Sequence, residues 1–169
     1  QCDWSSDVCS SDLLTMADGH VWFSNDDDGA IYVSRLEDLH PRKLFGAPGL
    51  RFADLTWDPR SGLLYAVMED HSKAGVEPRN SIVAVDTDGQ LQTIAFGHDF
   101  FSNPVPLGSG LGVAYLCWDH PNMPWDASEI WYQPGLKDAK PVRLAGGQGQ
   151  SCFGPSVGPR SEEHTSELQ

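Results

Sequence analysis

Two segments of the chain concentrate the side chains best suited to polar chemistry. The first reads MEDHSKAGVEPRN over residues 68–80, and the second reads CWDHPNMPWD over residues 117–126. Both contain an Asp-His pair that follows an apolar run and precedes turn-forming residues. Loops carry binding function more often than strands do. We therefore predict that one set of side chains projects from a common face toward a ligand or a neighbouring domain: Glu69, Asp70, His71, Trp118, Asp119, His120, Trp125 and Asp126.

Serine-type hydrolysis would need a nucleophile that this chain does not supply. An α/β-hydrolase presents its serine on a G-x-S-x-G turn between a strand and a helix. The nearest match, GQSCF at residues 149–153, has Phe153 where the second glycine belongs. His71 and His120 therefore have no serine partner, and no Ser-His-Asp triad can be assigned. We predict that the chain contains no catalytic residue.

The motif closest to a metal site is also incomplete. Residues 24–29 read SNDDDG and place Asp26 and Asp28 at positions 3 and 5 of a calcium loop. Position 1 would then be Ser24 and position 12 would be Arg35, where such a loop needs a bidentate glutamate. A solvated hairpin turn is the better interpretation. We predict neither a metal site nor a cofactor.

The elements that would position these side chains are short strands. Apolar or alternating runs bounded by turn residues recur along the chain, and no long stretch has helical periodicity. Such a chain is typical of an all-β fold. The runs cover residues 20–25, 30–36, 42–45, 52–59, 63–70, 80–87, 91–96, 103–108, 112–119, 128–133 and 141–146.

These strands repeat at a nearly constant spacing. Tyr65 and Tyr115 are 50 positions apart, Ile82 and Ile130 are 48 apart, and Ile31 precedes Ile82 by 51. Four strands recurring at about 40–50 residues are typical of β-propeller blades. A β-sandwich with accidental spacing is the alternative, but the recurring strand order favours the propeller.

The predicted fold is therefore a partial β-propeller, with about two complete four-stranded blades and further partial ones. The boundaries follow the repeats: a partial blade at 14–46, blades at 48–96 and 97–146, and the start of another at 150–159. Equivalent positions in successive blades are related by rotation about the propeller axis. Asp70 and Asp119 are 49 positions apart, so we predict that their loops share one face. A structural role remains open, in which Trp118 and Trp125 pack between blades and Asp119 closes a turn.

The two ends of the chain differ from everything between them. One oligonucleotide, read on its two strands, encodes both RSEEHTSELQ at the end and DWSSDVCSSDL near the start. It resembles a sequencing-library adapter, and natural disordered tails are the alternative. We expect residues 1–13 and 160–169 to be adapter-derived and not native, and residues 14–159 to be an internal fragment of a longer protein.

The charge of the chain and its cysteine content limit the classes of molecule that it is expected to bind. The chain has 11 basic and 24 acidic residues and a net charge of −13. Without the two ends it has 10 basic and 18 acidic residues, a net of −8. An acidic chain with no basic run argues against nucleic acid and against anionic membranes. Cys117 and Cys152 lack the spacing of a metal or redox motif and are expected to be reduced and buried. The compartment stays open, with a cytoplasmic location slightly favoured.

Several segments resemble a known family. RFADLTWDPRSGLLYAVMEDH, EPRNSIVAVDTDG, GHDFFSNP, WDHPNMPWDASEIW and LAGGQGQSCFGPS are similar to the N-terminal β-propeller of the prolyl oligopeptidase family, and to its acylaminoacyl-peptidase and dipeptidyl-aminopeptidase-like members in particular. The segment NPVPLGSGLGVAYL departs from the family, which has a Ser-Pro-Asp-Gly turn there. The resemblance covers nearly all of residues 14–159.

The resemblance implies a substrate-gating propeller of a serine peptidase. The partners would be a C-terminal α/β-hydrolase domain of the same parent chain, which carries the catalytic residues, and a short peptide substrate. A non-catalytic propeller that serves as a binding or scaffold module is the alternative. The sequence beyond Pro159 would distinguish the two.

Overall fold

The computed structural model describes residues 13–108, 110–135 and 139–157, and these residues form strands and turns without a helix. The strands fall into three groups of four. The first group holds β1 (Leu14–Ala17), β2 (His20–Ser24), β3 (Ile31–Arg35) and β4 (Arg42–Phe45). The second holds β5 (Leu50–Asp58), β6 (Leu63–Asp70), β7 (Arg79–Val85) and β8 (Leu91–Phe96). The third holds β9 (Phe100–Pro106), β10 (Gly112–Trp118), β11 (Glu129–Pro134) and β12 (Val142–Gly146).

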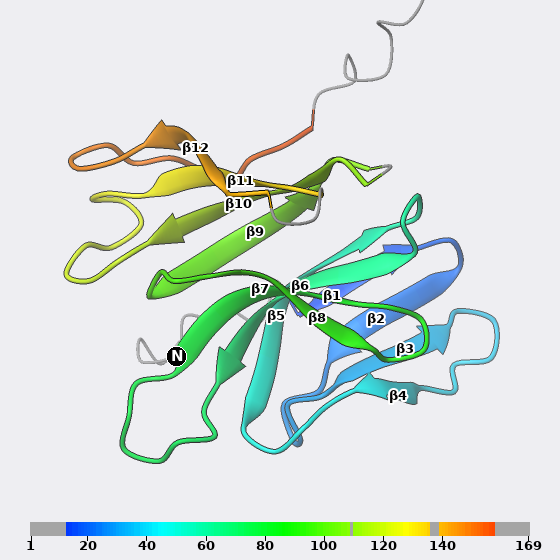
Figure 1. Ribbon diagram of the computed structural model, residues 1–169. Helices are drawn as coiled ribbons and strands as arrows, with labels where there is room; N and C mark the ends of the chain where they lie inside the picture. Colours follow the sequence, from blue (N-terminus) through cyan, green and yellow to red (C-terminus); the bar gives the residue numbers. More distant parts are fainter. Residues whose placement is uncertain (1–12, 109, 136–138, 158–169) are drawn as a thin grey trace, which may run out of the picture.

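Each group is one antiparallel sheet whose strands pair in chain order. The first strands of neighbouring sheets contact each other, β1 against β5 and β5 against β9. Figure 1 shows the three sheets following one another, with β9–β12 above β5–β8. Consecutive four-stranded sheets that meet through their first strands are propeller blades. The predicted all-β fold and partial propeller are confirmed, and β1 gives the first blade four strands where the sequence predicted a partial one.

The position of the central blade between two others explains why its strands contain continuous apolar runs. On β7, Val83 and Val85 pack in a cluster shared with the first blade, while Ile82 and Ala84 pack in a cluster shared with the third. Successive side chains of a strand point to opposite faces of its sheet. A blade with a neighbour on each side therefore buries both faces, and the apolar run is continuous. The core of the molecule lies between blades.

A carboxylate also links two first strands. Asp54 lies at a register shift of β5 with φ 51°, and Asn103 has the same φ at the equivalent point of β9. The Asp54 Oδ2 accepts hydrogen bonds from the Ser102 hydroxyl and the Asn103 backbone N–H, both at 2.8 Å. The carboxylate of Asp54 in the preceding blade thus satisfies the backbone N–H of Asn103, which would otherwise lack an acceptor.

Residues 1–12 and 158–169 lie outside the described residues, as does nearly all of both predicted adapter-derived ends. The expectation that these ends are adapter-derived and not native therefore stays a prediction. Among the described residues, no helix is long and apolar enough to cross a membrane.

Candidate functional site

The two loops predicted to carry function occupy equivalent places in neighbouring blades. The first connects β6 to β7 and the second connects β10 to β11. Both lie at the left of Figure 1, on the same side as the link from β8 to β9. Glu77 of the first loop binds His120 of the second, with 2.7 Å between Oε1 and Nε2. The prediction that these loops share a face is confirmed by this contact.

The Asp119 carboxylate connects the second loop to the β8–β9 link. Its Oδ2 lies 2.8 Å from the Nδ1 of His98, and its Oδ1 accepts the backbone N–H of Asp99 at 2.7 Å. The Asp99 carboxylate in turn accepts the backbone N–H of His120 at 2.9 Å. We name Glu77, His98, Asp99, Asp119 and His120 the loop-face network. It joins three connections of two blades through charge-assisted hydrogen bonds.

A groove adjoins this network on the side of the central blade. It is open to solvent, has a volume of about 430 Å³, and is lined by polar side chains that include Glu77, Arg79, Asn80 and His98. Phe96 adds an apolar wall that is 81% exposed. The groove offers carboxylate, guanidinium and imidazole groups to a polar ligand or to a facing protein surface.

The ion pair between the loops depends on pH. The hydrogen bond to Glu77 raises the pKa of His120, partial desolvation opposes that shift, and the nearby carboxylates of Glu77, Asp99 and Asp119 support it. Protonated His120 is therefore favoured in the folded chain. The contact therefore contributes its full stabilisation at a pH below the pKa of histidine in the unfolded chain. This contribution is lost as the pH rises through the raised pKa of His120 in the folded chain.

We expect Glu77→Gln to lower the pKa of His120, because the substitution removes the carboxylate that favours the imidazolium. The measurement is an NMR titration of the His120 ring. Glu69→Gln is the matched control, since Glu69 bonds His71 and not His120. A His120 pKa that is the same in Glu77→Gln as in the unsubstituted chain would show that the loops do not meet in solution.

The remaining candidates of the first loop interact locally. Glu69 bonds His71 at 2.8 Å. The Asp70 carboxylate accepts the backbone N–H of Ser72 at 2.9 Å, and hydrogen bonds from Ser72 hold the pKa of Asp70 below its usual value. These contacts shape the turn and do not extend to the loop-face network.

The two tryptophans of the second loop have different environments. Trp118 is buried, and its ring stacks on Phe100 with 5.4 Å between centroids, so it is a core residue. Trp125 is 56% exposed, so it does not fill the space between blades. Asp126 lies beside it in a turn in which its backbone N–H donates to the Met123 carbonyl at 2.9 Å. Of the apolar candidates, Trp125 is the one accessible to a partner.

The hairpin turn of the first blade is exposed at residues 26–28, as expected of the solvated turn that the sequence predicted. Lys43 donates to Asp28 at 3.0 Å, and Ala30 N–H and the Tyr32 hydroxyl donate to the same carboxylate. The hydrogen bond from Lys43, with that from Ala30, lowers the pKa of Asp28 to about 2. The Asp28 carboxylate is thus bonded to a cation on β4 and to a backbone donor of its own hairpin.

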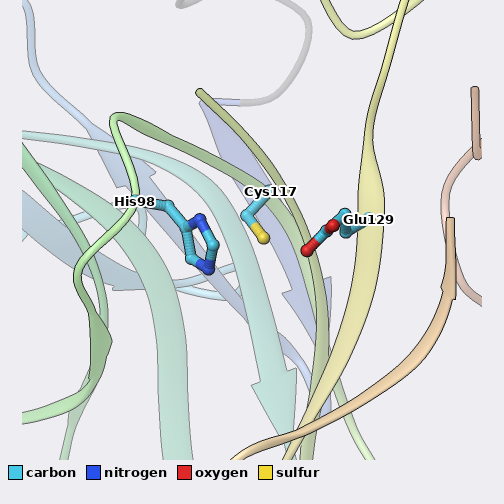
Figure 2. A group of neighbouring side chains, drawn as sticks. All are labelled: His98, Cys117 and Glu129. Carbon is cyan, nitrogen blue, oxygen red and sulfur yellow. The ribbon is translucent and has the colours of Figure 1, made fainter. Parts of the chain in front are cut away.

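The structure also brings together three side chains that the sequence did not single out as a group. Figure 2 shows the Cys117 sulfur between the His98 ring and the Glu129 carboxylate, and ligand-type atoms of all three lie within 4.8 Å of one another. Burial raises the pKa of the Cys117 thiol, and the Glu129 and Asp119 carboxylates add to that shift. Burial also pushes the pKa of Glu129 upward, but hydrogen bonds from Arg143 and Trp131 outweigh it and lower that pKa.

Both described cysteines are free, as predicted, but they differ in burial. Cys117 is fully buried on β10, whereas Cys152 is only partly buried. The sequence prediction that both are buried is therefore wrong for Cys152. The reason is position: Cys152 follows the last strand in an irregular segment, where no further blade among the described residues covers it.

Ser151, from the nearest match to a nucleophile elbow, is not presented as a nucleophile. Its hydroxyl donates to the Pro124 carbonyl at 3.0 Å, and residues 151–157 have no regular secondary structure. A nucleophile elbow would need a strand before it and a helix after it. The local structure supports the rejection of this motif.

The fold and its loop face define a partial β-propeller, and comparison with solved structures relates it to peptidases. A puromycin-hydrolyzing peptidase of Mycobacterium tuberculosis matches with a TM-score of 0.71 and 30% identity, over 86% of this chain and 25% of that one. A puromycin hydrolase matches with a TM-score of 0.68 and 26% identity, over 77% and 22%. The acylaminoacyl peptidase of Pyrococcus horikoshii matches with a TM-score of 0.58 at 15% identity, over 83% and 26%, which shows the shared fold.

These matches confirm the predicted resemblance to the β-propeller of the prolyl oligopeptidase family. The chain spans about a quarter of the length of the peptidases that it matches. No family model matches the sequence, and none of the curated protein sequences matches it.

Proposed function

We propose that this chain is part of the substrate-gating propeller of a serine peptidase, and that an α/β-hydrolase domain of the same parent chain supplies the catalytic residues. The observation that carries the proposal is the 30% identity to a puromycin-hydrolyzing peptidase over 86% of the chain. Similarity at this level, together with a TM-score of 0.71, supports descent from a common ancestor. A propeller over the active site would exclude large proteins, so short peptides and aminoacyl amides of the puromycin kind are the proposed substrates.

The loop face is the proposed surface for the hydrolase domain or the substrate. Its network exposes carboxylates and imidazoles, and Trp125, in the same β10–β11 loop as Asp119 and His120, adds exposed apolar area. Interfaces between domains of one chain combine apolar and polar contacts in this way. Glu69, Asp70 and His71 flank the same face at the end of β6.

The chain by itself is expected to hydrolyse neither aminoacyl nor peptidyl esters, because Ser151 is engaged with a backbone carbonyl and lacks the strand-turn-helix setting of a nucleophile. The measurement compares ester hydrolysis by the purified chain with that by Ser151→Ala. Equal, background-level rates are the expected result. Turnover that disappears in Ser151→Ala would show that this chain contains a catalytic serine, and would contradict the proposal that the hydrolase domain supplies the catalytic residues.

A further inference from the structure

We propose that His98, Cys117 and Glu129 form a binding site for a divalent, borderline-soft metal ion, with Zn²⁺ as the preferred occupant. The three side chains come from different elements: the β8–β9 link, the end of β10 and the start of β11. Cys117 and Glu129 are direct cross-strand partners, so the fold places their side chains together. Ligand-type atoms of all three groups lie within 4.8 Å of one another (Figure 2).

The ligand types match zinc. Zn²⁺ is bound by cysteine sulfur, histidine nitrogen and carboxylate oxygen, with bond lengths of about 2.0–2.3 Å. In a tetrahedral site such bonds put ligand atoms about 3.3–3.6 Å apart, so the ligand atoms must approach one another by up to about 1.5 Å to complete the geometry. A thiolate and a carboxylate together carry two negative charges, which balance the charge of the ion. Three protein ligands leave the fourth position for a water molecule.

Hydrogen bonds from neighbouring side chains orient two of the three ligands, His98 and Glu129. The Nδ1 of His98 is bonded to Asp119, which leaves Nε2 as the ring nitrogen available to an ion. A histidine whose other nitrogen bonds a carboxylate is the common arrangement at zinc. Arg143 donates to Oε1 of Glu129 and Trp131 donates to Oε2, both at 2.7 Å. Each carboxylate oxygen keeps a second lone pair for the metal.

Access and burial also suit an ion. Cys117 is fully buried, which protects a metal–sulfur bond from solvent. The side chains of His98 and Glu129 are each 22% exposed, so the cluster can be reached from the surface. When sulfur binds the ion, the thiol proton leaves to water. A bound ion would fasten the β8–β9 link to the third blade at a point next to the loop-face network.

The test uses cobalt as a spectroscopic substitute for zinc. The chain is prepared without a histidine tag and with Cys2, Cys9 and Cys152 replaced by serine, which leaves Cys117 as the single thiol. Addition of Co²⁺ is expected to produce a sulfur-to-cobalt charge-transfer band and tetrahedral d–d bands at one equivalent, and Zn²⁺ is expected to displace both. His98→Gln and Glu129→Gln should abolish or strongly weaken the band. Asp119→Asn, which removes the carboxylate charge beside the Nδ1 of His98, should weaken cobalt binding about 10–100-fold.

His71→Gln is the matched control, because this histidine pairs with Glu69 in another loop. Its band and affinity should equal those of the parent chain. The His98 and Glu129 variants should also retain the β-sheet circular dichroism of the parent, which separates loss of the site from loss of the fold. Absence of a thiolate band with excess cobalt, or a band that survives His98→Gln unchanged, would overturn the proposal.

Discussion

Phe101→Ala is expected to lower the free energy of unfolding by about 3–5 kcal/mol, the usual cost of removing a buried phenylalanine side chain. Phe101 is only 5% exposed and packs between the second and third blades with Tyr65, Ile82 and Tyr115. Its removal leaves a cavity between two sheets that their hydrogen bonds hold in place. The loss of stability therefore measures how strongly the second blade packs against the third.

Phe96→Ala provides the matched control for chemical denaturation. Phe96 is the same residue type at the end of the neighbouring strand β8, but it is 81% exposed. Its replacement should change the unfolding free energy by less than about 0.5 kcal/mol. Equal losses for the two variants would mean that the blades do not pack through the Phe101 cluster in solution.

Gly89→Ala is expected to be the second most damaging change, and its cause is a close approach between blades. Gly89 lies in the β7–β8 turn with φ 79°, and an added Cβ would lie 2.4 Å from the carbonyl oxygen of Leu44 on β4. The substitution therefore costs both a left-handed backbone conformation and displacement of a strand in the first blade.

Gly62→Ala separates these two costs. Gly62 has a similar φ of 68° in the β5–β6 turn, but no atom lies within 4 Å of an added Cβ. It should lose about 1–2 kcal/mol from the backbone conformation alone, and Gly89→Ala should lose about 1–3 kcal/mol more from overpacking. Thermal and urea unfolding of both variants measure the difference. The same stability for both would contradict the contact between the β7–β8 turn and β4.

The repeated strands could be predicted from sequence because each leaves a local pattern. Tyr65 and Tyr115 lie on the second strands of their blades, and Ile31, Ile82 and Ile130 lie on the third strands, as the spacing of about 50 residues indicated. The first strand of the first blade was missed. LTMA is four residues long with two exposed apolar side chains, so it lacks both the length and the contrast that mark a strand.

The candidate site was predicted only in part, because its contacts join residues that are distant in sequence. Asp119 and His120 were singled out from their own loop, but their partners His98 and Glu77 lie 21 and 43 positions away. For Trp118 the sequence allows both a contact role and a packing role, and the structure shows a core residue at the end of a strand that is buried along nearly its whole length. Cross-strand register, which pairs Cys117 with Glu129, cannot be obtained from spacing alone.

The most direct test of the account is the native coding sequence that follows Pro159. We predict further blades of about 50 residues and then an α/β-hydrolase domain with a G-x-S-x-G elbow. We also predict that the native sequence departs from residues 160–169. Expression of that longer chain should give hydrolysis of short aminoacyl substrates that is lost when the elbow serine is replaced by alanine. A reading frame that ends after propeller blades, with no hydrolase domain in the same chain, would contradict the account and leave a binding module.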